Sequence, residues 1–107
     1  MNKDAEQKIN QLQMMEYNMH SLSNQRQQFH NQLLEIESAL SDIEGKDTAF
    51  KIIGNIMVEM KQVDLKTSLE EKKERLQIRI KNIEKQEKGL KEKAEKIQKD
   101  VMQNLKE

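Results

Sequence analysis

Hydrophobic residues recur at alternating steps of three and four along two long stretches of the chain. The first ladder, interrupted only by Arg26, consists of Leu12, Met15, Met19, Leu22, Phe29, Leu33, Ile36, Leu40 and Ile43. The second ladder, with Lys73, Glu87 and Asn104 at its polar steps, consists of Leu69, Leu76, Ile80, Ile83, Leu90, Ala94, Ile97 and Val101. A three-four repeat held over several heptads is typical of a coiled-coil seam. The ladders predict helices over about residues 5–44 and 64–106.

A different pattern separates the two ladders. Between residues 48 and 60, β-branched and aromatic residues flank the pair Gly54-Asn55. This pattern predicts a β-hairpin with a two-residue turn in which Gly54 takes a positive φ. We expect Gly45 to end the first helix. We expect Asp64 to cap the second, with the capping box Thr67-Ser68-Leu69-Glu70 as an alternative start.

The predicted helices have similar lengths and a short connection, so the second is expected to fold back antiparallel along the first. Setting Leu33 beside Leu76 aligns the ladders and brings Arg26 within about one turn of Glu87. We predict a partly buried ion pair with a net stabilisation near zero. The pair would fix the register, because a slip of one heptad would strand both charges. The alternative is that both side chains extend into water.

The predicted hairpin is apolar on both faces. One face carries Ile53, Ile56, Val58 and Met60, and the other carries Phe50, Ile52 and Met57. A lone two-stranded hairpin is marginal in water, its edges invite pairing, and two helices can cover little of it. We therefore expect an obligate oligomer whose hairpins join edge to edge into a closed barrel. The predicted assembly residues are Phe50, Ile52, Ile53, Gly54, Asn55, Ile56, Met57, Val58 and Met60.

Composition and charge narrow the classes of function. The chain has 107 residues, of which 36% are charged, 35% are hydrophobic, three are aromatic and none is cysteine. The apolar fraction is too small for a compact globular core. The lack of cysteine excludes a thiolate nucleophile. The 19 basic and 19 acidic residues cancel, so no global field attracts nucleic acid or anionic lipid. Apolar runs are too short for a membrane span or a secretory signal, so a single-domain cytoplasmic protein over 1–107 is expected.

The sequence contains no convincing catalytic or metal-binding motif. Glu16 and His20 lie four residues apart and could share a metal, but no third ligand accompanies them. Gly45-Lys46-Asp47-Thr48 lacks the upstream glycine and the preceding strand of a phosphate-binding loop. The many carboxylates fall on exposed helix faces, where no cleft could perturb their pKa values. We expect no enzymatic activity, no metal and no cofactor.

The order of elements resembles the β-class subunit of archaeal prefoldin. The resemblance spans essentially the whole chain, and three segments carry it: Phe50-Lys51-Ile52-Ile53-Gly54-Asn55-Ile56-Met57-Val58, Glu71-Lys72-Lys73-Glu74-Arg75-Leu76 and Ile83-Glu84-Lys85-Gln86-Glu87. It implies a hexamer of two α-class and four β-class subunits, with a double β-barrel platform and six projecting coiled coils. It also implies ATP-independent capture of unfolded proteins and their delivery to a group II chaperonin.

Apolar residues remain outside the seam at the end of the coiled coil remote from the hairpin, and they are scarcer near the hairpin. Methionine repacks against many shapes, and several weak contacts together supply avidity. We predict a client-binding tip over residues 9–19 and 97–105, formed by Ile9, Met14, Met15, Tyr17, Met19, Ile97, Val101, Met102 and Leu105. The alternative is that these are ordinary apolar residues on frayed terminal turns.

Two other functions compete with a chaperone. The 13 basic residues of the second helix could bind nucleic acid, but ten acidic neighbours and the lack of an aromatic platform argue against it. A purely structural adaptor gives no reason for a doubly apolar hairpin. A group of second-helix lysines could dock an acidic chaperonin surface or simply form a solvated face, namely Lys88, Lys91, Lys93, Lys96 and Lys99.

Overall fold

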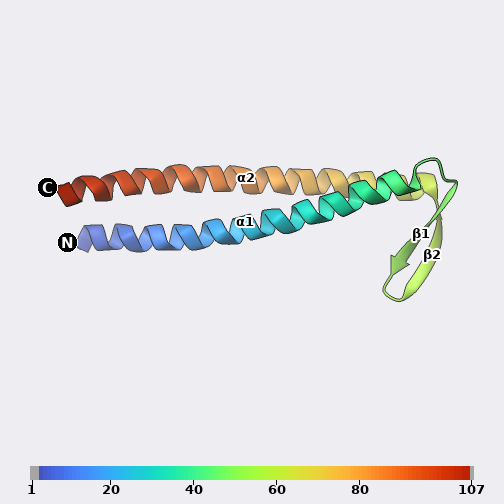
Figure 1. The fold of residues 1–107 in the computed structure, drawn as a ribbon, viewed down its shortest axis with the longest axis horizontal. Coiled ribbons are helices and arrows are strands. Elements are labelled where there is room, and N and C mark those ends of the chain that lie inside the picture. The colour runs from blue at the N-terminus through green and yellow to red at the C-terminus, as the bar shows by residue number, and fades with distance from the viewer. Residues whose placement is uncertain (1–2, 107) are drawn as a thin grey trace. The chain divides into compact units, whose positions relative to one another are not determined.

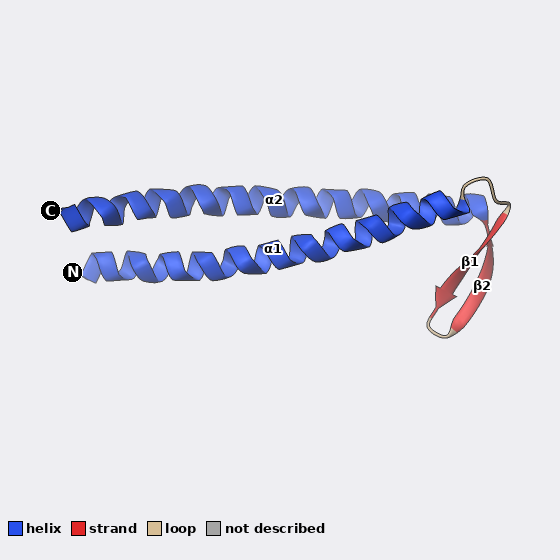
Figure 2. Ribbon diagram, in the orientation of Figure 1, coloured by secondary structure: helices blue, strands red, loops and turns tan. Residues whose placement is uncertain are grey.

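The computed structural model describes residues 3–106. Its elements are α1 (Lys3–Ile43), β1 (Thr48–Ile53), β2 (Ile56–Lys61) and α2 (Gln62–Lys106), as Figures 1 and 2 show. The predicted order of helix, hairpin and helix is confirmed. The chain forms two compact units, which we describe separately. The terminal unit contains α1 up to Gln27 and α2 from Lys81, and the hairpin unit is Gln28–Ile80.

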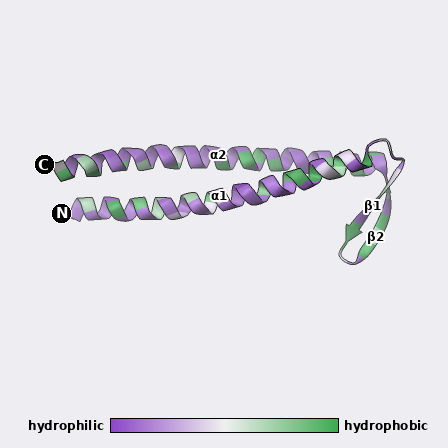
Figure 3. Ribbon diagram, in the orientation of Figure 1, coloured by the Kyte–Doolittle hydropathy of each residue, from purple (hydrophilic) through white to green (hydrophobic). Residues whose placement is uncertain are grey.

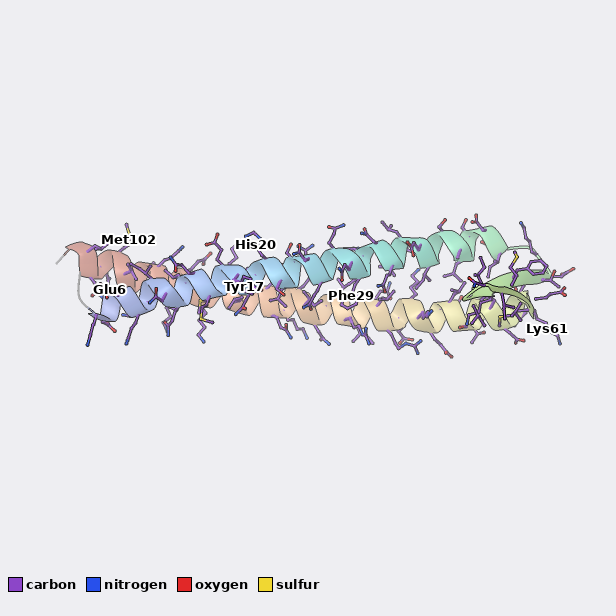
Figure 4. All side chains as sticks on the ribbon, turned by 90° about the horizontal axis from the view of Figure 1, so that it is seen from below. Glu6, Tyr17, His20, Phe29, Lys61 and Met102 are labelled. Atoms are coloured by element: carbon purple, nitrogen blue, oxygen red, sulfur yellow. The ribbon has the colours of Figure 1, made fainter. Side chains whose placement is uncertain are left out.

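The core of the hairpin unit lies between its two antiparallel helix segments. Leu33, Leu76 and Ile80 form a buried cluster, against which Phe29 and Ile36 pack. Phe29 lies between the helices in Figure 4, and the Arg79 guanidinium carbon lies 5.6 Å from the centre of its ring. Burial of these apolar side chains holds the segments together. The cluster confirms the predicted alignment of the two ladders in this unit.

The hairpin has the predicted register and the predicted faces. The strands pair antiparallel, with Ile53 opposite Ile56 and Lys51 opposite Val58. Gly54 has a φ of 60°, whereas no residue other than glycine in the described chain has a positive φ. A positive φ at the first of two turn residues alone is the pattern of a type II′ turn, which suits the twist of a hairpin.

The helix ends beside the hairpin agree with the prediction in position, and only the first agrees in its cap. Gly45 ends α1 with a φ of 76°, and the Lys46 amide donates to the Ile43 carbonyl over 3.2 Å. However, α2 begins at Gln62, directly after β2, which agrees with the expected start near residue 64 to within a few positions, but Asp64 is not its N-cap. The Gln62 amide donates to the Asp47 carbonyl over 3.0 Å, which satisfies an N-terminal amide without a capping side chain.

The predicted capping residues of α2 lie inside the helix instead. Asp64 is in its first turn, where its charge suits the helix dipole. The Thr67 hydroxyl donates to the Val63 carbonyl over 3.0 Å, a bond to the preceding helical turn. The alternative prediction of a capping box at Thr67 is therefore also wrong.

The seam of the terminal unit follows the predicted ladders. Every predicted ladder residue in this unit is buried or half-buried, including the polar Arg26, Glu87 and Asn104. The three-four spacing also continues toward the N-terminus from Leu12 to Lys8 and Ala5, and Ala5 is only 2% exposed. The seam is thus longer than predicted. No helix in residues 3–106 has an apolar stretch long enough to cross a lipid bilayer.

Candidate assembly and client-binding surfaces

The hairpin exposes a large apolar surface. Among its exposed apolar residues, the exposed fraction ranges from 40% for Val58 to 70% for Ile52. The others are Phe50, Ile53, Ile56 and Met57. Figure 3 shows the apolar character of both strands. In the described chain β1 and β2 pair only with each other, so the outer edge of each strand retains unpaired backbone groups. Such an edge is a template for a strand of another chain.

Arg26 and Glu87 form the predicted ion pair within the terminal unit. The Arg26 Nε donates a hydrogen bond of 2.8 Å to the Glu87 Oε1. The side chain of Glu87 is 16% exposed and that of Arg26 is 34% exposed. Both residues occupy steps of the seam that are otherwise apolar. The contact is therefore present, while its role in fixing the register stays a prediction.

Four apolar residues of the terminal unit lie outside the seam with large exposed fractions. On α1, Met14 and Tyr17 are 69% and 76% exposed, and on α2, Met102 and Leu105 are 59% and 60% exposed. Each pair is spaced i, i+3 and therefore shares one side of its helix. Figure 4 shows Met102 pointing away from the helices. We refer to these four residues as the tip residues.

The two pairs of tip residues lie at different levels along the terminal unit. The Lys8 Nζ lies 4.0 Å from the Asp100 Oδ2, so residues 8 and 100 are level with one another. Met102 and Leu105 are consequently level with the first turns of α1. Met14 and Tyr17 lie further along α1, toward the ion pair. The exposed apolar surface therefore consists of two separate pairs.

The other predicted client-binding residues are less accessible. Met15, Met19 and Ile97 are half-buried members of the seam, and Ile9 is half-buried beside it. Val101 is only 8% exposed because it is a seam residue. Its assignment as a client-contacting side chain does not fit this structure, and the expectation that Ile9 is left fully outside the packing is also corrected.

Exposed apolar residues outside the seam also occur on the helices of the hairpin unit, where they are slightly fewer than in the terminal unit. In the hairpin unit, Leu34, Val63 and Ile78 are 61%, 68% and 53% exposed and lie outside the ladders. Val63 directly follows the hairpin. All three could have been found as apolar residues that the three-four spacing leaves over. The two units therefore differ little in how much apolar surface their helices expose, and they differ mainly in which residues are exposed and where.

The remaining candidate groups have no organised geometry. Within residues 3–106 no three potential ligands among His, Asp and Glu come close enough to hold a metal ion. The five lysines proposed for chaperonin docking are all exposed on α2. Their role stays a prediction.

Two long helices joined by an exposed two-stranded hairpin, with a heptad seam along both helices, define a coiled-coil hairpin protein. Residues 6–107 match the sequence profile of the family described as prefoldin subunit. The chain belongs to this family. Prefoldin subunits are chaperone subunits that work in a complex with other prefoldin subunits, and they are not a class of enzyme.

Individual archaeal proteins show the same similarity. Prefoldin subunit beta of Archaeoglobus fulgidus is 35% identical over 91% of this chain and 85% of its own length. Prefoldin subunit beta of Methanospirillum hungatei is 31% identical, over 94% of this chain and 87% of its own. The crystal structure of the prefoldin beta subunit from Thermococcus strain KS-1 superposes with a TM-score of 0.91 at 26% identity, covering 99% of this chain and 96% of that one.

Proposed function

We propose that this chain is a β-class subunit of a holdase that captures unfolded proteins without ATP and passes them to a group II chaperonin. Its hairpin joins those of other subunits in a hexamer of two α-class and four β-class chains. The terminal unit supplies the client-binding surface. Family membership supports the chaperone class, and the exposed apolar hairpin with two free edges supports assembly.

The proposal that the terminal unit binds clients rests on the exposure of the tip residues. Each pair places a methionine beside another large apolar residue, outside the packing that holds the helices together. A flexible thioether repacks against varied partners, so such a surface tolerates many sequences. Each pair offers a small contact area. Several subunits acting on one client would therefore be needed for stable capture.

The test removes the tip residues from the assembled complex without shortening the chain. The variant Met14→Ser, Tyr17→Ser, Met102→Ser and Leu105→Ser changes only exposed positions, so the seam and the hairpin are retained. We expect it to form the same complex with a co-expressed α-class subunit, as measured by native mass spectrometry. We expect it to lose most suppression of client aggregation, as measured by light scattering of a denatured client diluted into buffer.

The matched control replaces exposed apolar residues of the hairpin unit. The variant Leu34→Ser and Ile78→Ser removes side chains of similar exposure from the same two helices, and it should suppress aggregation as the parent chain does. A truncation lacking residues 1–10 and 98–107 is a second test with the same expected loss. Unchanged suppression by the tip variant and the truncation would contradict client capture at this surface.

Partner choice is tested by the composition of the complex. We expect a hexamer when the chain is mixed with an α-class subunit, and transfer of a bound client to a group II chaperonin without nucleotide. Replacing the five α2 lysines with glutamine should weaken that transfer if they dock the chaperonin. A salt-dependent mobility shift with tRNA, with no hexamer, would instead favour a nucleic-acid-binding coiled coil.

A further inference from the structure

We infer that a groove in the hairpin unit docks an acidic, extended segment of another protein. The groove is lined by residues of both helices, and its α2 wall carries Lys72, Arg75 and Arg79, all exposed. Neither the strands of the hairpin nor the tip residues line it. The inference therefore depends neither on the proposed assembly nor on client capture, and it adds a second kind of partner.

The groove combines an apolar floor with polar walls. Its most buried lining residues are Leu76, which is 7% exposed, and Ile36, which is half-buried. Its volume is about 360 Å³, so it holds a short stretch of a partner and not a folded domain. The cations on its α2 wall lie at positions i, i+3 and i+7, on one side of the helix. The first and the last, Lys72 and Arg79, are about 10.5 Å apart along the helix axis.

The three cations have no carboxylate partner within the described chain. In residues 3–106, no ion pair with a separation of up to 4.0 Å includes Lys72, Arg75 or Arg79. Lys72 and Arg79 also have no acidic residue three or four positions away on α2, where Arg75 has only Glu71. On the α1 wall, Glu35 is the one carboxylate among the residues that line the groove. The chain therefore leaves most of the positive charge of the groove unneutralised.

One of the three cations is positioned by an aromatic ring. The Arg79 guanidinium carbon lies 5.6 Å from the centre of the Phe29 ring, within the range of a cation–π interaction. Phe29 in turn packs against the buried cluster of the seam and lies between the helices in Figure 4. The ring therefore restrains the guanidinium beside the groove. A cation that is already positioned loses less side-chain freedom when it binds a carboxylate.

A second groove in the hairpin unit has the opposite balance of charge. It has a volume of about 300 Å³, and Leu40, Glu44, Lys66 and Glu70 are among the residues that line it. Here one cation is accompanied by two carboxylates, whereas the first groove has three cations and one carboxylate. The charges of this unit are thus separated between two grooves. An ordinary solvated face with alternating charges would not separate them in this way.

The occupant that fits this groove is an acidic polypeptide segment with an apolar side chain. Carboxylates form strong, often bidentate, hydrogen bonds with arginine. In an extended segment, alternate side chains point to the same side and lie about 7 Å apart. An apolar residue on Leu76 then has a carboxylate two positions before it and another two positions after it, within reach of Lys72 and Arg79. A nucleic acid fits less well, because the cations are few and the floor is aliphatic, with no exposed aromatic ring for base stacking.

The test uses a fluorescently labelled peptide in which two glutamates flank one leucine at alternate positions. Its binding to the purified full-length chain is measured by fluorescence anisotropy at low salt, and it should weaken as salt screens the charges. Gln32 lines the groove, whereas Gln25 lies one heptad earlier on α1 and outside it, and both are exposed. Gln32→Glu adds a like charge without a change of size and should weaken binding about threefold. Gln25→Glu should leave the affinity unchanged.

Changes to the charged residues give a gain and a loss of affinity. Glu35→Gln removes the repelling carboxylate and should tighten binding about threefold, a gain that misfolding cannot produce. Lys72→Gln with Arg75→Gln should weaken binding about tenfold. The matched control is Lys81→Gln with Lys85→Gln, which removes the same charge from exposed α2 positions outside the groove and should change the affinity less than about twofold. Circular dichroism checks that each variant remains helical.

Several outcomes would overturn the inference. The parent chain might show no saturable binding below about 1 mM peptide. Equal losses in the two double variants, or unchanged binding of a peptide with glycine in place of leucine, would reduce the groove to unspecific charge attraction. Tighter binding of a single-stranded oligonucleotide of equal charge would assign the groove to nucleic acid.

Two further measurements separate this groove from the proposed function. The tip variant should bind the peptide as the parent chain does, so a failure of client capture at the tip leaves this test intact. The variant Lys72→Gln with Arg75→Gln should suppress client aggregation normally. A loss of suppression in that variant would make the groove a client surface, and a loss of self-association would make its occupant a second copy of the chain.

Discussion

The seams of the two units differ in how completely they exclude polar groups. In the hairpin unit the ladder is apolar except for Lys73, whose Nζ lies 3.8 Å from the Glu37 Oε1, and it contains the buried cluster around Leu76. In the terminal unit the seam includes Lys8, Arg26, Glu87 and Asn104. The same heptad spacing therefore builds a mostly apolar seam near the hairpin and a mixed seam toward the chain termini.

Under the proposed function, this difference would suit a division of roles within one pair of helices. Local opening is easiest where few apolar side chains are fully buried. A stable hairpin unit suits a part that holds the assembly together. A more readily opened terminal unit suits a part that adapts to varied clients. The comparison therefore predicts unequal responses to matched changes in the two units.

The largest expected difference comes from shortening one leucine in each seam. Leu76→Ala removes a side chain that is 7% exposed, and it should lower the free energy of unfolding by about 2–4 kcal/mol. Leu90→Ala removes the same atoms from a half-buried seam position, and it should cost about half as much, roughly 1–2 kcal/mol. Urea unfolding at one fixed protein concentration measures both. Equal losses would remove the distinction between the seams.

An intermediate effect is expected from breaking the ion pair. Glu87→Ala leaves the Arg26 cation unpaired in the seam, but Arg26 is 34% exposed and can turn toward water. We therefore expect a loss of about 1–2 kcal/mol, below that of a fully buried charge. Replacing both residues with leucine should restore or exceed the original stability in urea unfolding, because no charge remains in the seam.

The register provides the more specific readout of the ion pair. The chain has no cysteine, so an introduced pair can be cross-linked without background. Met19→Cys with Leu90→Cys reports the native alignment, and Met19→Cys with Ile97→Cys reports a slip of one heptad. We expect the slipped cross-link only in the double-leucine variant. Its absence there would show that apolar packing alone fixes the register.

The smallest effect is expected at two glycines that differ in backbone conformation. An alanine Cβ at Gly89 would meet no atom within 4 Å, and this residue lies inside α2. Gly89→Ala should therefore stabilise the terminal unit by about 1 kcal/mol through helix propensity. Hydrogen exchange of α2 amides around residue 89 should slow accordingly.

Gly45 is the matched control for Gly89. It also has open space around it, but its φ is 76°, so Gly45→Ala should destabilise the chain by about 1 kcal/mol. A stabilising effect at both positions would mean that the left-handed end of α1 is not strained by a side chain. A neutral Gly89→Ala would mean that the terminal unit does not depend on local helix propensity.

The fold could be predicted because its determinants are local and repetitive. The three-four ladders alone place the seam and align Leu33 with Leu76, and the pair Gly54-Asn55 alone places the turn. The exact first residue of α2 and its cap could not be predicted in this way. Its first amide is satisfied by the Asp47 carbonyl, which is distant in sequence and is brought there by the hairpin. Asp64 and Thr67 have side chains that suit a helix cap, so the sequence favours them although neither caps α2.

The candidate surfaces could be predicted only in part. Val101 was already a member of the predicted ladder, so its burial followed from the same pattern that placed it at the tip. Ala5 and Lys8 continue the spacing but carry too little apolar character to stand out. Leu34 and Ile78 show a second limit of prediction from sequence. Periodicity identifies the residues of a seam, but it does not tell what an apolar residue outside the seam contacts.

The absence of any connecting residue between Lys61 and Gln62 couples the strand directly to the rotation of α2 about its axis. Each residue of an α-helix turns by about 100°, so inserting a single residue at this junction would swing Leu76 and Ile80 away from α1 while leaving the hairpin intact. The length of the junction thus fixes which side of α2 faces α1. Natural length variation in this family should accordingly be found in loops or at chain ends and be suppressed at this point.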